Sequence, residues 1–325
     1  MLSHSRALVK ARRGPQTTGE SSLPSSSIFE YEDFLFGYIK DIPLISFNYA
    51  GMNNENEEEM TLRQVLRASV GVMGESPLGM TEKVVLLGGK ISAVKRFKRV
   101  VIRKNEFGRR IERLANIGNQ SHYLVPLTAY LYAKRIKFVV THYYPMGTLA
   151  HLLSGAKEEG HTALEWKHRY RIILCIARAI EFIHSQNPPR DKNLKLNVHG
   201  NIKTSNVMIN IDFTARLSDY GFVQLAEQAA VEDTGQAEVP APPLGLVYKE
   251  KLSQESDIYN FGVVLMDILG WPDVERSDHV FEFCVGGEEK QASNVLEIAL
   301  RCTNSLLDAR PTINQILSWL EDSVK

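Results

Sequence analysis

The sequence predicts an α+β protein with two lobes, a small β-rich lobe followed by a large α-helical lobe. Two observations support this order. Residues 69–144 carry short runs of β-branched and aromatic residues around a single amphipathic helix, a pattern typical of a small sheet with one helix. From residue 145 onward the apolar residues recur mostly at helical spacing. Strands grouped before helices, rather than alternating with them, indicate the α+β class.

The β-rich lobe is predicted from short segments bounded by turn residues. Thr61 precedes the first of them and suits a helix N-cap, because its side-chain oxygen can accept a hydrogen bond from the first turn. Gly88 and Gly89 separate two strand-like runs and predict a hairpin turn. The predicted elements are a short helix at 61–69, strands at 83–87 and 91–97, a helix at 104–117, and strands at 123–132 and 137–144.

The helical lobe is predicted from longer apolar patterns. Residues 164–185 carry isoleucines and alanines at helical spacing. Residues 256–270 are apolar nearly all round, which predicts a buried central helix. Residues 293–305 and 312–322 predict two closing amphipathic helices. No internal repeat is visible, so a solenoid or propeller is not expected.

Composition limits the classes of function. The chain has 325 residues, 44% of them hydrophobic, enough for a large or two-lobed domain. Its 38 basic and 38 acidic residues balance, so nucleic acid is not an expected partner. We predict a disordered, partly basic tail at 1–27, which in an alternative interpretation touches anionic lipid. Residues 28–60 form a juxtamembrane-like lead-in whose aromatic residues predict ordering against a folded body; 61–144 and 145–325 are the two lobes.

Cysteine usage and hydropathy predict the compartment. Cys175, Cys284 and Cys302 share no metal-ligand spacing, so free thiols in a reducing compartment are expected. No stretch reaches the ~18 apolar residues that a membrane span requires. The first residues also lack the apolar region of a signal peptide. The chain as given is therefore expected to be soluble and cytoplasmic.

Five short motifs occur in order along the chain. They are Lys95 on a strand after a glycine-containing turn, HGNIKTSN (199–206), DYG (219–221), DIYNFG (257–262) and RPT (310–312). Each is weak alone, but their joint order and spacing are specific. Together they resemble the protein-kinase signature set: the strand lysine, H-R-D-x-K-x-x-N, D-F-G and the D-x-Y-x-F-G helix. The resemblance covers about residues 60–322 and implies a bilobal protein-kinase-like fold.

The sequence around these motifs resembles a narrower family. The segments LVPLTAYLYAKRIKFVVTHYYPMGTLAHLLSG, VHGNIKTSNVMI and IALRCTNSLLDARPT resemble plant leucine-rich-repeat receptor-like kinases, and most of all their atypical, inactive subgroup. That family normally has an ectodomain and one membrane helix, and neither is present in this sequence. The chain is then either a cytoplasmic portion or a product that never had them. The resemblance implies protein partners such as other receptor kinases, and a location at the cytoplasmic face of the plasma membrane.

The resemblance implies that part of a nucleotide site is kept. Lys95 matches the lysine that pairs with the α- and β-phosphates. Asn206 and Asp219 match the two magnesium ligands and carry oxygen donors suited to that cation. Thr141 falls at the gatekeeper position and Tyr143 in the hinge. ATP and Mg²⁺ are therefore the cofactors implied, with weak or absent binding as the alternative.

The same resemblance indicates a loss at the catalytic centre. Asn201 stands where the catalytic aspartate is expected, and an amide cannot accept the substrate proton; loss of general-base help typically costs ~10²–10⁴ in rate. Lys203, in the same loop, matches the lysine that reaches the γ-phosphate in Ser/Thr-type kinases. Gly200 replaces the arginine that would pair with a phosphorylated activation loop. That loop, roughly 222–245, contains a single hydroxyl residue, Thr234.

Two further motifs are degraded. Gly74 and Gly79 match the first and third glycines of a G-x-G-x-x-G loop, but Ser76 replaces the second glycine. Pro77 removes a backbone N–H, and backbone N–H groups are what cradle phosphate in such a loop. The A-P-E motif is replaced by Pro-Leu-Gly at 243–245. These changes predict weakened nucleotide binding and weakened bracing of the second lobe.

The partner of Lys95 is open from the sequence. An alignment from Phe107 places Arg110 at the position of the usual helix glutamate, and an alignment back from 124–126 places Glu112 there. We favour Glu112, because two adjacent cations would repel each other.

Three motif residues have interpretations that are mainly structural. Asp257 is expected to brace the catalytic loop, to act as a helix N-cap, or both. His199 and Tyr220 are expected to be core residues, and the Tyr220 hydroxyl then requires a partner.

These observations predict a pseudokinase that acts as a scaffold or allosteric partner in receptor-type signalling at the plant plasma membrane. One alternative is a switch that binds ATP without transferring phosphate. The other is a weakly active Ser/Thr kinase, because positioning supplies most of the catalysis of phosphoryl transfer.

Overall fold

The computed structural model describes residues 41–47, 60–158, 164–187, 194–225, 252–270, 284 and 286–322. Residues 43–325 form one unit that holds both predicted lobes. The predicted tail at 1–27, Thr234 and the degraded motif at 243–245 lie outside the described residues.

The first lobe is built on a six-stranded sheet with the strand order β1-β5-β6-β4-β3-β2. Every neighbouring pair of strands is antiparallel. The predicted hairpin at Gly88 and Gly89 joins β3 to β4 and is closed by a 2.9 Å hydrogen bond from the backbone of Leu86 to that of Lys90. The strands are β1 (Ile45–Ser46), β2 (Ser69–Ser76), β3 (Gly79–Val85), β4 (Ile91–Phe97), β5 (Leu127–Tyr132) and β6 (Lys137–His142).

The lead-in and the short helix α2 (Leu62–Arg67) support the edge of this sheet. Thr61 is the N-cap of α2, as predicted, and forms a capping box with Gln64. Strand β1 adds a sixth strand beside β5. Phe47, which follows β1, stacks on Tyr130 of β5 with ring centroids 5.7 Å apart. Phe47 is the one aromatic residue of the lead-in within the described part, and it packs on the folded body; the ordering predicted from the other aromatic residues lies outside the described residues.

Helix α3 (Lys104–Gly118) packs its apolar face on the sheet, next to the strand that carries Lys95. Phe107 of this helix is fully buried and meets Phe97 of β4 edge to face, with ring centroids 5.8 Å apart. Ile111 and Leu114, on the same face, are also buried. The helix predicted at 104–117 is confirmed.

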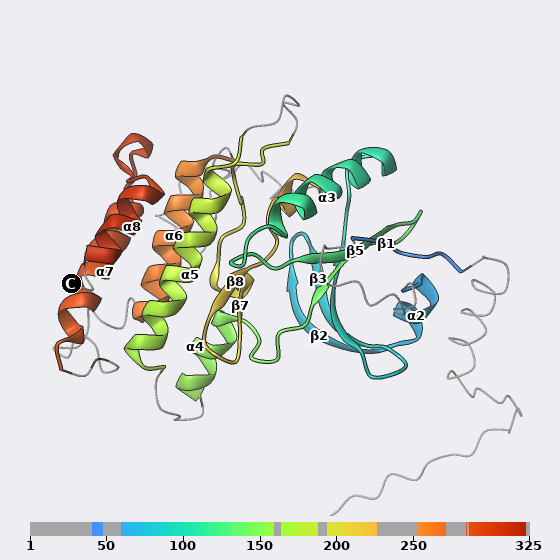
Figure 1. The fold of residues 1–325 in the computed structure, drawn as a ribbon, viewed down its shortest axis with the longest axis horizontal. Helices are drawn as coiled ribbons and strands as arrows, with labels where there is room; N and C mark the ends of the chain where they lie inside the picture. The colour runs from blue at the N-terminus through green and yellow to red at the C-terminus, as the bar shows by residue number, and fades with distance from the viewer. Residues whose placement is uncertain are drawn as a thin grey trace, which may run out of the picture. The chain divides into compact units, whose positions relative to one another are not determined.

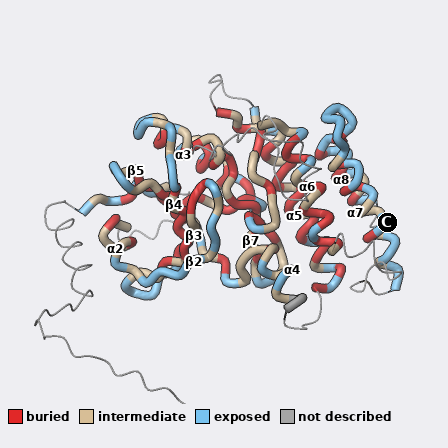
Figure 2. Tube along the Cα trace, turned by 180° about the vertical axis from the view of Figure 1, so that it is seen from behind, coloured by how far each residue is buried: buried red, intermediate tan, exposed pale blue. Residues whose placement is uncertain are grey.

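The second lobe is helical, with α5 and α6 side by side (Figure 1). Buried residues run along both helices (Figure 2), so the central helix predicted at 256–270 is confirmed. Its N-cap is Ser253, whose hydroxyl accepts a hydrogen bond from the backbone of Ser256 at 3.2 Å; the N-cap role predicted for Asp257 is wrong. The main helices are α4 (Leu149–Glu158), α5 (Trp166–His184), α6 (Gln254–Leu269), α7 (Glu288–Cys302) and α8 (Ile313–Asp322). None of the helices in the described ranges is long and apolar enough to span a bilayer.

A small hairpin connects the two lobes. Strand β7 (Val207–Ile209) pairs with β8 (Ala215–Leu217). The backbone of Val125, between α3 and β5, donates to that of Leu217 at 3.0 Å, and Leu217 donates back to Tyr123 at 2.8 Å. These bonds fix the end of β8 against the first lobe. The next residues, which include Asp219, are thereby placed between the lobes.

Candidate functional site

A cavity of about 130 Å³ lies between the sheet and the second lobe. The structure brings six of the predicted site residues to its wall. Asn201, Gly79, Glu112 and Tyr143 are not among its lining residues. The predicted residues that line it are Gly74, Lys95, Thr141, Lys203, Asn206 and Asp219.

The strongest electrostatic feature of the cavity is an ion pair across the lobes. Lys95 Nζ lies 2.6 Å from Asp219 Oδ2, and each side chain is 8% exposed. Lys95 comes from β4, and Asp219 follows β8 in the left-handed region, at φ 65°, which aspartate tolerates better than most residues. The magnesium ligand predicted from the sequence is therefore already neutralised by the strand lysine.

A second lysine faces the same carboxylate. Lys203 lines the cavity, and burial lowers its pKa, while Asp219 raises it and Lys95 lowers it. Two ammonium groups thus share the field of one carboxylate.

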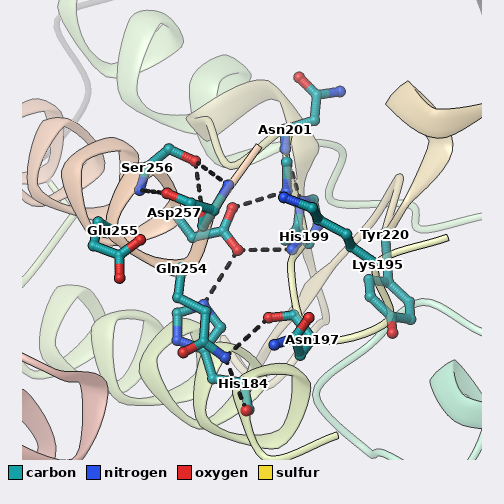
Figure 3. Close-up of polar contacts among 12 residues, drawn as sticks. His184, Lys195, Asn197, His199, Asn201, Tyr220, Gln254, Glu255, Ser256 and Asp257 are labelled. Carbon is teal, nitrogen blue, oxygen red and sulfur yellow. Dashed lines mark hydrogen bonds and ion pairs between the residues drawn. The ribbon is translucent and has the colours of Figure 1, made fainter. Parts of the chain in front are cut away.

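The loop that carries Asn201 is held through backbone groups. Asn206 Nδ2 donates to the Asn201 carbonyl at 2.8 Å, a bond that engages the amide nitrogen of this cavity-lining residue and not the oxygen that would bind a metal. The Nδ2 of Asn201 is buried and has no hydrogen-bond partner in the described part of the chain. Its side chain points away from the Asp257 carboxylate (Figure 3).

His199 is a buried neutral imidazole. Its Nδ1 accepts from the Asn201 backbone at 3.1 Å, so the proton lies on Nε2, which is 2.9 Å from the Ser218 carbonyl. Burial lowers the pKa of His199, against the opposing field of Asp257 and Asp219. The interpretation of His199 as a core residue agrees with this geometry.

Asp257 braces the loop from the start of α6, to the left of His199 in Figure 3. Its Oδ2 accepts the backbone N–H of His199 at 2.7 Å, and its Oδ1 accepts that of Gly200 at 2.8 Å. His184 Nε2 lies 3.2 Å from Oδ2. Asp257 has 0% exposure, so these partners satisfy a carboxylate that would otherwise be costly to bury.

The predicted pairing of Glu112 with Lys95 is not formed. Glu112 instead accepts a hydrogen bond from the Tyr130 hydroxyl at 3.3 Å. Burial and Glu112 together raise the pKa of Tyr130 to about 12. Arg110 lies on another face of α3 and donates to the Gln224 carbonyl at 2.8 Å. Two residues along a helix rotate a side chain by roughly 200°, which explains why the two candidates point in different directions.

The glycine-loop segment forms a tight hairpin between β2 and β3. Ser76 opposes Gly79 in the register, and the Ser76 hydroxyl donates to the Gly79 carbonyl at 3.1 Å. A Cβ at Gly79 would lie 1.9 Å from the Arg96 carbonyl oxygen, so close strand packing requires glycine there. In the hinge, the Lys83 ammonium lies 4.8 Å from the ring centroid of Tyr143; that ring packs on a strand instead of lining the cavity.

The residue types of this site suit Mg·ATP, but their arrangement does not. Asp219 is bound by Lys95, and the cavity measures about 130 Å³, whereas ligand pockets usually measure about 300–1,000 Å³. Phe222, directly after the DYG motif, and Leu114 of α3 fill part of the space and line the wall. Sequence reasoning did not identify these two side chains; the position of Phe222 after DYG was the available signal.

A sheet lobe and a helical lobe with a cavity between them, and a strand lysine that meets the aspartate of a DYG motif, define the protein-kinase fold. Residues 82–320 match the model of the family described as protein tyrosine and serine/threonine kinase. The chain belongs to this family.

The curated relatives are plant receptor kinases. The chain is 31% identical over 289 residues to the probable inactive receptor kinase RLK902 of Arabidopsis thaliana, with 80% of this chain and 43% of the relative covered. It is 32% identical over 287 residues to an inactive leucine-rich repeat receptor-like serine/threonine-protein kinase of that plant (81% and 42%). A third relative there, a probable leucine-rich repeat receptor-like protein kinase, is 32% identical over 297 residues (82% and 43%). The chain spans less than half the length of these relatives.

Two solved structures confirm the predicted bilobal fold. The pseudokinase domain of BIR2, an immune regulator of the RLK/Pelle family, superposes with a TM-score of 0.67 at 26% identity, covering 87% of this chain and 90% of that one. The maize SIRK1 kinase domain bound to AMP-PNP gives a TM-score of 0.65 at 24% identity, covering 87% and 100%; this second likeness concerns the fold alone.

Proposed function

We propose that this chain is a pseudokinase domain that signals by binding protein partners and does not transfer phosphate. The observation that carries the proposal is Asn201, which lacks the charge needed to accept the substrate proton. The ion pair between Lys95 and Asp219 supports it, because the usual magnesium ligand is engaged. Relatives named as inactive receptor kinases support it as well.

The partners would be other receptor kinases or signalling proteins at the cytoplasmic face of the plant plasma membrane. The names of the relatives support this location, as does the likeness to a pseudokinase described as an immune regulator. A scaffold role requires a stable binding surface and no turnover cycle. The fully bonded Asp257 brace supplies rigidity to the loop that a kinase would use for catalysis.

A second candidate function is a switch that binds ATP without transferring phosphate. It is favoured by one observation: Lys95, Asn206 and Asp219 line the same cavity. In this case the nucleotide would have to displace Lys95 from Asp219. The two lobes would then shift relative to each other when the nucleotide binds.

One set of measurements tests these functions on the full chain. Transfer of labelled phosphate from ATP to a generic protein substrate is measured for the wild type, Asn201→Asp and Lys95→Ala, and Mg·ATP is titrated in a thermal-shift assay. We expect no transfer from the wild type and no shift at millimolar ATP. A clear shift without transfer would favour the switch, and wild-type transfer that disappears in Lys95→Ala would overturn the pseudokinase proposal.

A further inference from the structure

Arg110 lies on the face of α3 that meets the second lobe. Phe107 precedes it by three residues and Leu114 follows it by four, and both are buried. Residues at these spacings share one helix face, and Leu114 lines the cavity. At the border of this face, Arg110 presents its charged side chain to the segment after Asp219, because its guanidinium donates to the Gln224 carbonyl, whereas Glu112 is directed to β5.

The Arg110 guanidinium bridges α3 and the short helix η2 (Phe222–Gln224). Its Nη1 donates to the Gln224 carbonyl at 2.8 Å, and its Nε donates to Glu106 Oε1 at 2.6 Å. The side chain is only 11% exposed. The hydrogen bond from Arg110 is the main cause that lowers the pKa of Glu106, so Glu106 is a charged partner that orients the guanidinium.

Gln224 also forms two hydrogen bonds with Lys195, in the segment of the second lobe that precedes His199. The backbone N–H of Lys195 donates to Gln224 Oε1 at 2.7 Å, and Gln224 Nε2 donates back to the Lys195 carbonyl at 2.9 Å. The path of hydrogen bonds therefore runs from α3 through η2 to the irregular segment that leads to His199. Each of its links is a specific directional bond rather than general packing.

Apolar packing follows the same path. A Cβ at Gly221 would lie 2.5 Å from Leu114 Cδ2, so α3 rests directly on the DYG turn. Phe222 meets Phe97 of β4 with ring centroids 5.6 Å apart and occupies part of the cavity wall. When α3 packs on the DYG turn in this way, Lys95 forms its ion pair with Asp219.

We propose that Arg110 is a latch that keeps the nucleotide site closed: it fastens α3 to η2 and, being a cation, leaves Lys95 to pair with Asp219. The latch rests on the pseudokinase function proposed above. It adds to that function an explanation of how a site with suitable ligand groups excludes Mg·ATP. A carboxylate at position 110 would lose the Gln224 carbonyl as a partner and compete with Asp219 for the lysine. Asp219 would then be free for magnesium.

The test compares Arg110→Glu with Arg109→Glu in the full chain. Arg109 is the matched control, because it is the adjacent residue, also pairs with Glu106, and is 53% exposed. Mg·ATP binding is measured by isothermal titration for both variants and the wild type. We expect Arg110→Glu to bind at least about tenfold more tightly than the other two, a typical size of coupling between two sites. Adding Asp219→Asn to Arg110→Glu is expected to abolish this gain.

A folded Arg110→Glu variant that binds no better than Arg109→Glu would overturn the latch. If Arg110→Glu does not fold, Arg110→Gln and Arg109→Gln replace the pair, and hydrogen exchange at the Lys195 amide is measured. The latch predicts exchange about tenfold faster in Arg110→Gln alone, within the range of coupling between sites, and unchanged exchange would refute it. Phosphate transfer by the wild type would instead contradict the proposed function, while the comparison between the two arginine variants would still decide on the latch.

Discussion

The two sides of the loop at 199–206 differ in how their polar groups are bonded. On the side of α6, Asp257 binds two backbone N–H groups of the loop and approaches His184. On the side away from Asp257, Asn201 has an amide nitrogen with no partner among the described residues, and in the neighbouring cavity Asp219 is occupied by Lys95. The contacts that hold the loop are complete, while those that would carry chemistry are altered. The side chains that hold the loop in shape are thus different from those at the positions where a kinase carries its chemistry.

Asp257→Ala should have the largest effect, because it removes the brace. The backbone N–H groups of His199, which is buried, and of Gly200, which is half-buried, would lose their acceptor together with His184, and removing one partner from a buried charged network typically costs about 3–5 kcal/mol. We expect a loss of this size in the free energy of unfolding, measured by urea denaturation.

Asp267 provides the control for this variant on the same helix. It is exposed, and its hydrogen bond with Thr204 is 3.5 Å long. Asp267→Ala should change the free energy of unfolding by less than about 0.5 kcal/mol, as surface substitutions usually do. Similar losses in the two variants would mean that the brace contributes no more than an ordinary surface carboxylate.

Gly200→Ala should have the next largest effect. Gly200 has φ +81°, and a Cβ there would lie 2.6 Å from Leu252 Cδ1 and 2.8 Å from Val223 Cγ2. A left-handed conformation costs a residue with a Cβ about 1–2 kcal/mol, and overpacking adds about 1–3 kcal/mol. We expect a loss of at least about 2 kcal/mol in urea denaturation. Restoring arginine at this position, as active kinases have it, should therefore destabilise the protein.

Gly74→Ala is the matched glycine on the cavity side. Nothing lies within 4 Å of a Cβ at Gly74, and its φ is not in the left-handed region. Its free energy of unfolding should stay within about 0.5 kcal/mol of the wild type. A cost at Gly74 equal to that at Gly200 would contradict the distinction between the two sides.

The neutral state of His199 predicts a pH dependence. Burial lowers its pKa below the ordinary value of 6.5, so below pH 6.5 the unfolded chain binds a proton that the folded chain does not. The contribution of His199 to the free energy of unfolding is therefore fully present above pH 6.5. It is lost as the pH falls from 6.5 toward the pKa of His199 in the folded state, by up to about 1.4 kcal/mol per pH unit. Urea denaturation at pH 7.5 and pH 5.5 should show this loss in the wild type and a smaller one in His199→Gln. Equal losses would mean that His199 is not the group responsible.

Much of the fold was predictable because its signals are local and periodic. The apolar pattern of α6 and the capping residue Thr61 of α2 depend on neighbours within one or two turns. The order of the motifs then placed Lys95, Asn206 and Asp219 at one cavity.

The contacts of α3 were not predictable in the same way. Whether Arg110 or Glu112 approaches the site depends on the rotation of the helix about its axis when it packs on the sheet, and a shift of one residue turns it by about 100°. The sequence leaves that rotation open because the loop after α3 can be aligned in two ways. The direct pairing of Lys95 with Asp219 also depends on the spacing of two lobes, which no local pattern encodes.

Apart from the controls, Tyr220→Phe should change the free energy of unfolding least of these variants. It tests the comparison between the cavity and the supporting core, because Tyr220 contacts both. It lines the cavity, and its hydroxyl donates to the Leu196 carbonyl in the supporting core. Burial raises the pKa of this hydroxyl, so it stays a neutral donor. The variant recreates the D-F-G motif but leaves a buried carbonyl without its donor, at a cost of about 1 kcal/mol in urea denaturation. Mg·ATP binding should not appear, because Arg110 and the Lys95–Asp219 ion pair remain; binding as tight as that expected of Arg110→Glu would place the closure of the site at Tyr220 instead.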